Sequence, residues 1–224
     1  MISLPFSGRL ICGDALIVLK SLPDKSVDLI VTDPPYGDNI GYGVHNRTIL
    51  GNEHPLVGLS ALSEAYRVLK ANSAAYVFCG TRHLGFVSTF FQTYTKYKLR
   101  DIIIWDKVLQ GRGHGFRRRY ECIVVLEKGR PIYRRPGFPN LIRCVRTRYV
   151  QHPHEKPVEL LKPLIEHSSE VGDIVLDPFL GSGSSAVAAR ELGRGYIGIE
   201  LDPTYCKIAE ARLNAQTVTL RQIA

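Results

Sequence analysis

The chain has 224 residues and an apolar fraction of 45%, which suits one globular domain over residues 1–224. No run of about 18 apolar residues predicts a membrane helix, and the N-terminus lacks the pattern of a signal peptide, so we expect a cytoplasmic protein without a membrane partner. The five cysteines are spread along the chain: Cys12, Cys79, Cys122, Cys144 and Cys206. They include no Cys-x-x-Cys pair, which predicts reduced thiols and no metal.

Short apolar runs and helical spacing predict strands and helices in alternation. In the first half we expect strands at 9–14, 27–33, 74–79 and 102–105, and helices at 15–21, 55–70 and 84–97. In the second half we expect strands at 120–127, 174–176 and 196–199, and helices at 157–168, 186–192 and 203–214. Residues 37–54, rich in Gly and Asn, and 131–150, rich in Arg and Pro, are predicted to be irregular. The alternation predicts an α/β fold with a doubly wound, mainly parallel sheet.

The formal net charge of +8 is unevenly distributed. Residues 107–150 contain 12 Lys and Arg and two Glu, so the rest of the chain is slightly acidic. Aromatic residues are interleaved with these cations, as is typical of surfaces that bind nucleic acid, although a solvated loop is the plain alternative. The expected contacts to nucleic acid are all arginines: Arg112, Arg117, Arg118, Arg119, Arg134 and Arg135.

The segment Asp33-Pro34-Pro35-Tyr36 follows the apolar run 27–32. Proline has no N–H to donate to a strand ladder, so two in series end the strand at its carboxyl edge, where open α/β sheets bind ligands. Asp33 and the Pro34 carbonyl can accept hydrogen bonds from a nucleobase amine, and Tyr36 can stack on the ring. A tight turn without a ligand is the alternative.

Residues 173–202 read as strand, Gly-rich turn, helix, strand and acidic residue. Gly181 and Gly183 allow close approach of a ligand, and Glu200 can accept both hydroxyls of a ribose. Asp177 stands four residues before the first glycine, where a carboxylate disfavours a phosphate but suits a cation. S-adenosylmethionine has a sulfonium, an ammonium and a ribose, so it fits this pattern better than a nicotinamide dinucleotide.

Both motifs resemble those of the amino-group DNA methyltransferases, which methylate adenine N6 or cytosine N4. The matching residues are Asp33-Pro34-Pro35-Tyr36 and Asp177-Pro178-Phe179-Leu180-Gly181-Ser182-Gly183, and their order is similar to the β group of the family. Two further segments are similar: Cys12-Gly13-Asp14-Ala15 and His152-Pro153-His154-Glu155-Lys156-Pro157. The resemblance covers nearly the whole chain. One departure is His154, which stands where the family usually has Thr.

The resemblance implies a Rossmann-like sheet of seven strands with a circularly rearranged motif order. Residues 120–127 are then the antiparallel strand, and the strand at 174–177 lies beside the strand at 28–32. It also implies catalytic roles on a flipped base for Asp33, Pro34, Pro35 and Tyr36. The residues implied to bind S-adenosyl-L-methionine lie in several segments: Asp14, His152, Lys156, Asp177, Phe179, Gly181, Ser182, Gly183 and Glu200. Lys156 is the residue expected to meet the methionine carboxylate.

An exocyclic amine is a poor nucleophile because its lone pair is delocalised into the ring. Hydrogen bonds from the amine to Asp33 and the Pro34 carbonyl favour a pyramidal nitrogen, which attacks the methyl group by direct displacement and depends mainly on orientation. No cysteine stands in a nucleophile motif, which disfavours methylation at cytosine C5.

Asp rather than Ser at the start of the catalytic motif favours adenine N6 over cytosine N4 within this family. Methylation of cytosine N4, methylation of RNA or of protein amides, and a DNA-binding protein with an inactive site are the alternatives. Residues 37–54 and 107–150 are the expected DNA-contacting insertions. Because these insertions are small, we expect a short or relaxed target sequence and a solitary enzyme without a paired nuclease. The oligomeric state is left open, a homodimer included.

Overall fold

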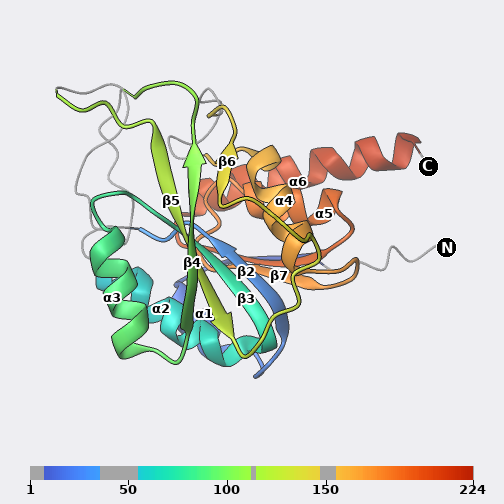
Figure 1. The fold of residues 1–224 in the computed structure, drawn as a ribbon. Coiled ribbons are helices and arrows are strands. Elements are labelled where there is room, and N and C mark those ends of the chain that lie inside the picture. The colour runs from blue at the N-terminus through green and yellow to red at the C-terminus, as the bar shows by residue number, and fades with distance from the viewer. Residues whose placement is uncertain (1–7, 36–54, 112–114, 147–154, 224) are drawn as a thin grey trace.

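The computed structural model describes residues 8–35, 55–111, 115–146 and 155–223 (Figure 1). The strands are β1 (Gly8–Cys12), β2 (Val27–Thr32), β3 (Leu69–Cys79), β4 (Lys98–Asp106), β5 (Tyr120–Lys128), β6 (Leu141–Arg143), β7 (Ile174–Asp177) and β8 (Gly195–Glu200). The helices are α1 (Ala15–Ser21), α2 (Pro55–Val68), α3 (Leu84–Tyr94), α4 (Val158–Ser168), α5 (Ser184–Glu191) and α6 (Pro203–Ile223). Every predicted element in this part of the chain is present, and the differences lie at element ends.

The strands form one sheet in the order β1-β8-β7-β2-β3-β5-β4-β6. β5 is antiparallel to both of its neighbours, β3 and β4, and the other pairs among the described strands are parallel. The predicted antiparallel strand is therefore confirmed. Two strands distant in sequence, β2 and β7, pair through Leu29 with Val175 and Ile30 with Leu176. The pairing confirms the predicted adjacency of the two strands. Because they are parallel neighbours, the ends that carry the two motifs lie at the same sheet edge.

The prediction of seven strands is wrong, because the described residues alone form a sheet of eight. The additional strand, β6, lies in the stretch 131–150 that was expected to be irregular, and it pairs Ile142 with Trp105 of β4. Its neighbourhood is rich in Arg and Pro and has no strand pattern of its own. The open edge of β4 supplies the hydrogen-bonding partners, so a tertiary contact decides its conformation.

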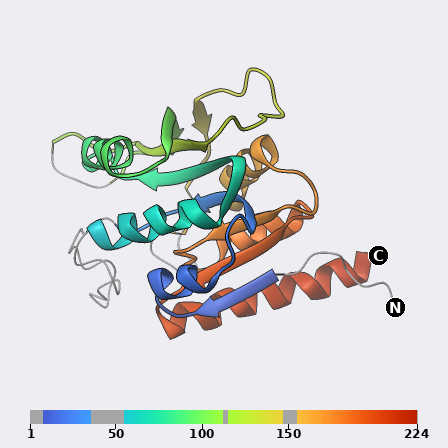
Figure 2. The ribbon, with the colours of Figure 1, turned by 90° about the horizontal axis from the view of Figure 1, so that it is seen from below.

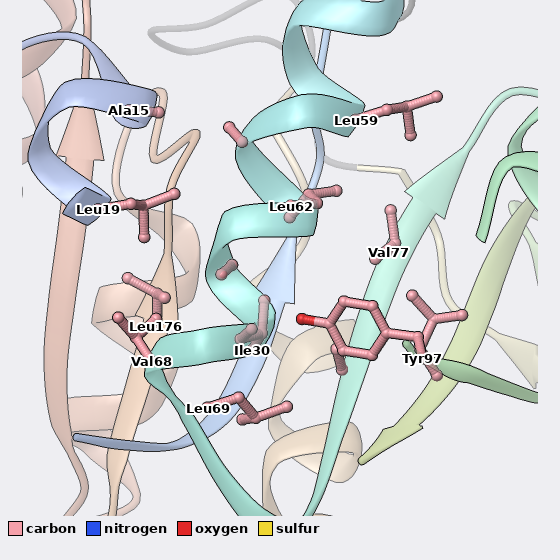
Figure 3. Packing of buried hydrophobic residues seen from close by; sticks show 14 of the residues in the cluster. Ala15, Leu19, Ile30, Leu59, Leu62, Val68, Leu69, Val77, Tyr97 and Leu176 are labelled. Atoms are coloured by element: carbon pink, nitrogen blue, oxygen red, sulfur yellow. The ribbon is translucent and has the colours of Figure 1, made fainter. Parts of the chain in front are cut away.

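Helices cover both faces of the sheet (Figures 1 and 2). Successive residues of β2 point to opposite faces: Ile30 joins the core under α1, α2 and α3, whereas Leu29 and Val31 join the core under α4 and α5. Figure 3 shows Leu19 of α1 and Leu62 of α2 in the same cluster as Ile30 and Val77 of the sheet. The central strands β2, β3, β5 and β7 are buried on both faces, which explains their continuous apolar runs.

The long helix α6 runs alongside β1 (Figure 2) and extends to Ile223, beyond the predicted end at 214. Cys206 of α6 forms a disulfide with Cys12 at the end of β1. The expectation of reduced thiols is therefore wrong for this pair, which is separated by 194 residues and gave no spacing signal. Cys79, Cys122 and Cys144 are free.

Candidate active site

The catalytic motif begins directly after β2, at the carboxyl edge of the sheet. Asp33 and Pro35 are half-buried and Pro34 is buried. The two prolines lie against Gly58 of α2: a Cβ at residue 58 would come within 3.1 Å of Pro34 Cβ and 3.3 Å of the Pro35 carbonyl oxygen. Gly58 therefore lets α2 approach the motif closely, a role that the sequence pattern did not reveal. Tyr36 lies outside the described residues.

Lys156 forms an ion pair with Asp33 through Asp33 Oδ2. It comes from the segment just before α4, and its ammonium also lies 3.4 Å from Glu121 Oε2. Burial acts to lower the Lys156 pKa, but the charges of Asp33 and Glu121 outweigh it and raise the pKa above its ordinary value. Lys156 therefore stays charged beside the catalytic carboxylate. Its expected contact with a methionine carboxylate stays a prediction, and His152 lies outside the described residues.

Asp177 is held at the end of β7 by three donors. The Thr32 hydroxyl and the Phe179 N–H donate to Oδ1 at 2.6 and 3.0 Å, and the Ser185 hydroxyl donates to Oδ2 at 2.5 Å. Burial raises the pKa of this carboxyl to about 6, although the three hydrogen bonds act in the opposite direction. Thr32 ties this carboxylate to β2, so the two motif-bearing strand ends are linked directly.

The Gly-rich turn after β7 depends on left-handed backbone at Gly181 (φ 55°) and Gly183 (φ 88°). Gly183 is the N-cap of α5, and a Cβ there would lie 3.1 Å from Ala209 Cβ of α6. Both conformational freedom and the lack of a side chain are therefore needed at this residue.

Arg212 of α6 contacts the Gly-rich turn from one side. Its guanidinium donates to the carbonyl and the hydroxyl of Ser182, each at 2.9 Å, and lies 3.2 Å from Glu155 Oε1. Ser182 in turn donates to Glu155 Oε2 at 3.2 Å. Glu155 belongs to the segment that carries Lys156, so these three residues connect the cofactor turn with the catalytic side.

Glu200 stands at the end of β8 and accepts the Gly181 N–H at 2.7 Å and the Asp202 N–H at 2.8 Å. Burial raises its pKa, while these backbone hydrogen bonds counteract the shift. Asp14 follows β1 and accepts the Ile17 N–H at 3.1 Å as the N-cap of α1. Hydrogen bonds thus fix both carboxylates at the same sheet edge as Asp177.

The polar groups at this edge suit a sugar and a cation better than a phosphate. Carboxylates and backbone N–H groups dominate it, and Glu155 already matches the charge of Arg212. Among the described residues, no group of His, Cys, Asp and Glu could hold a metal ion. In the same residues, no helix has the length and apolar character to cross a membrane.

The six arginines expected to contact nucleic acid differ in their surroundings. Arg119 makes a bidentate ion pair with Asp106, at 2.7 and 2.9 Å, and holds the Asp106 pKa at about 2. Arg134 and Arg135 pair with Glu170 and Glu166, at 2.6 and 3.5 Å. Arg112 lies outside the described residues, and Arg117 and Arg118 are exposed.

Residues 131–140 are docked on α4 rather than extended into solvent. The rings of Tyr133 and Phe138 both stack on His167, with centroid distances of 4.9 and 4.5 Å. The two aromatic residues, which were expected to interleave with the cations for binding, are thus partly buried. By contrast, Phe116 is fully exposed beside Arg117.

Four residues around the site were given no role from the sequence: Thr32, Gly58, Glu121 and Glu155. Thr32 and Glu155 adjoin residues that were given one, and that proximity was the available signal. Glu121 had none, because it opens a strand far from either motif.

The comparisons with known proteins agree with this geometry. The N6_N4_Mtase family model, described as DNA methylase, matches residues 27–149 and 136–211. The chain is 30% identical to the type II methyltransferase M.HpaI of Haemophilus parainfluenzae over 93% of this chain and 74% of that protein. It is 31% identical to the DNA adenine methyltransferase YhdJ of Escherichia coli (strain K12) over 92% of this chain and 82% of that protein.

Two solved structures share the fold. TTHA0409 of Thermus thermophilus, solved in complex with S-adenosyl-L-methionine, has a TM-score of 0.67 and 28% identity, and the match covers 92% of this chain and 94% of that one. The cytosine-N4-specific PvuII DNA methyltransferase has a TM-score of 0.77 at 19% identity, and the match covers 92% and 87%. The family match spans the catalytic motif, the Gly-rich turn and Glu200, and the chain belongs to the N6/N4 family of DNA methylases.

Proposed function

We propose that this DNA methyltransferase transfers the methyl group of S-adenosyl-L-methionine to the exocyclic N6 of adenine. The observation that carries the proposal is Asp33, a carboxylate that directly follows β2 and shares a sheet edge with the Gly-rich turn. The relative at 31% identity, named a DNA adenine methyltransferase, supports adenine. Cytosine N4 is the second candidate, because the PvuII enzyme has the same fold.

Asp33 and the Pro34 carbonyl would accept the two N–H groups of the target amine. The carboxylate orients the nitrogen and withdraws its protons from the plane of the ring, so the lone pair becomes available for attack. Alignment of two bound reactants supplies most of the rate enhancement in such a step. Tyr36, the last residue of the motif, is proposed to stack on the flipped base.

The cofactor is proposed to lie along the edge formed by β1, β8 and β7. S-adenosyl-L-methionine supplies an electrophilic methyl group bound to a sulfonium sulfur. Glu200 would accept the ribose hydroxyls, and the backbone of residues 179–183 would wrap the methionine part. Asp14 is proposed to lie near the adenine, and Asp177 would hold the turn in shape through Thr32 and Ser185.

The DNA-binding surface is proposed to begin at residues 115–118. The arms of this loop leave β4 and β5 at the edge that also carries Asp33, because Asp106 pairs with Tyr120 and Cys79 with Cys122. Arg117 and Arg118 are exposed there, and Phe116 can stack on an unpaired base. Residues 37–54, which lie outside the described residues, are proposed to contribute to DNA binding as well.

The test replaces Asp33 with Ala and measures transfer of radiolabelled methyl groups to DNA. We expect loss of at least 99% of the activity with cofactor affinity changed less than threefold, because Asp33 mainly orients the amine. Asp101→Ala, which removes an exposed carboxylate of β4, is the control. Activity near that of the control would contradict the role of Asp33.

Digestion of the methylated DNA to nucleosides separates the two candidate targets. N6-methyl-2′-deoxyadenosine as the labelled product is expected, whereas N4-methyl-2′-deoxycytidine would make cytosine the target. Absence of label from DNA in the unsubstituted protein would overturn the proposed function as a whole.

A further inference from the structure

We propose that Glu121 is a positioning residue that receives Lys156 when the target amine takes its place on Asp33. The inference rests on the proposed function, because it concerns how Asp33 becomes available to an exocyclic amine. It assigns a role to a residue that lies in neither sequence motif.

Four side chains of alternating charge form a chain at the catalytic edge: Asp33, Lys156, Glu121 and Lys107. Lys156 contacts Asp33 Oδ2 and lies 3.4 Å from Glu121 Oε2, and Lys107 donates to Glu121 Oε1 at 2.5 Å. The four residues come from four segments: the end of β2, the start of α4, the start of β5 and the end of β4. The fold therefore assembles this group only in the complete sheet.

The two carboxylate oxygens of Glu121 are used unequally. Oε1 accepts a hydrogen bond from Lys107, whereas Oε2 is buried and has no hydrogen-bond donor among the described residues. Charge-assisted N–H···O bonds are about 2.7–2.9 Å long, so Lys156 Nζ would need to move by roughly half an ångström to complete one with Oε2. A buried charged oxygen without a donor is unfavourable, so Oε2 is a ready acceptor for that ammonium.

Asp33 cannot bind the ammonium of Lys156 and accept a strong hydrogen bond from the target amine at the same time. While the ammonium is bound to it, the carboxylate is partly neutralised and is a weaker acceptor for the N–H groups of a base. Simple withdrawal of Lys156 would leave a buried ammonium unpaired, which is strongly unfavourable. Glu121 removes that penalty, because it keeps Lys156 paired as the amine arrives.

The surroundings favour both positions of the ammonium. Lys156 Nζ lies 5.3 Å from the centroid of the Phe78 ring, within the range of a cation–π contact, and half an ångström of travel preserves it. Lys107 also stays on Glu121 in either state, so the negative charge of Glu121 is never unmatched. The exchange requires no backbone movement.

The test compares Glu121→Gln with Glu121→Asp. Gln keeps the shape and loses the charge, whereas Asp keeps the charge and is shorter. We expect Glu121→Gln to lower the single-turnover rate of methyl transfer at saturating substrates at least tenfold, with the dissociation constants for cofactor and DNA changed less than twofold. Glu121→Asp should be faster than Glu121→Gln, because the charge receives the ammonium.

Glu127→Gln is the matched control. Glu127 lies on the same strand and has cationic neighbours in Lys98 and Arg100, but it is more buried, with 8% of its side chain exposed against 24% for Glu121, and it stands at the opposite end of β5. Its rate should stay within twofold of the unsubstituted protein. A Glu121→Gln rate at that level, or a Glu121→Asp variant slower than Glu121→Gln, would overturn the proposal, since a packing role depends on shape. The proposed function is judged separately, by methylation with the unsubstituted protein.

Discussion

At the scale of single residues, the site is built from carboxylates that are partly or wholly withdrawn from water. Asp177 and Glu200 both have raised pKa values because burial disfavours the charged form. Asp33 and Glu121 share Lys156 instead. The positions of Asp177 and Glu200 suit the geometry of the turn, and the burial of these carboxylates costs stability. The negative charges of Asp33 and Glu121 are balanced by the ammonium of Lys156.

Asp177→Asn is expected to stabilise the protein while impairing methylation. The native pKa of about 6 lies above the ordinary 3.8, so the folded state binds the proton more tightly and loses stability as the pH rises from about 4 to 6. About two pKa units correspond to about 3 kcal/mol, an upper limit for the gain at pH 7.5. Urea unfolding at pH 4 and 7.5 measures it. An Asn variant whose stability decreases as steeply as that of the unsubstituted protein over this range would contradict the assignment.

At the scale of elements, the connection from β7 to α5 determines where the cofactor turn lies. Its glycines have left-handed backbone, and α6 packs directly on Gly183 through Ala209. Helix α6 also supplies Arg212 to the carbonyl of Ser182. The last helix therefore acts as a support for the turn as well as a cover for the sheet.

Gly183→Ala should destabilise the protein more than Gly172→Ala. Both glycines have positive φ, 88° and 93°, so each alanine costs about 1–2 kcal/mol of backbone strain. At residue 172 the new Cβ has open space, whereas at residue 183 it meets Ala209 Cβ at 3.1 Å. We expect an additional loss of about 1 kcal/mol in urea unfolding and a tenfold or greater loss of cofactor affinity by calorimetry, both confined to Gly183→Ala. Equal behaviour of the two variants would show that α6 does not constrain the turn.

At the scale of the whole molecule, less positive charge is available for binding DNA than the charge excess of residues 107–150 indicates. Arg119, Arg134 and Arg135 are engaged by Asp106, Glu170 and Glu166. These ion pairs hold the three guanidinium groups against carboxylates of the protein, whereas Arg117 and Arg118 are exposed in the loop at 115–118. The charge excess in sequence therefore overstates the surface that DNA can reach.

Replacing Arg117 and Arg118 with Ala should weaken binding to all DNA sequences and reduce its salt dependence. Each phosphate contact contributes a slope of about −0.9 in log K against log salt, so the double variant should lose up to about two units. Arg134→Ala with Arg135→Ala is the matched control, and its slope should change by less than half a unit because those side chains pair with Glu170 and Glu166. Filter binding between 50 and 200 mM salt measures both. A larger change in the control pair would place the DNA surface on residues 130–146 instead.

Local pattern was sufficient for most elements and for both motifs. Helices such as α1 and strands such as β2 were predicted within a residue or two, because apolar periodicity, prolines and glycines act over short distances along the chain. The adjacency of β2 and β7 was also predicted, through the resemblance of motif order. Asp33, Asp177 and Glu200 were picked out by local pattern as well, since each stands at the end of an apolar strand.

Contacts between distant segments were beyond the reach of the sequence alone. β6 forms because β4 offers an open edge, and Cys12 meets Cys206 because α6 returns along β1. Arg134 and Arg135 face α4, and Lys156 binds Asp33 and approaches Glu121. In each case the partner is chosen by the packing of elements far apart in the chain, whereas residue type and local spacing determine only where a strand, a turn or a charge will be.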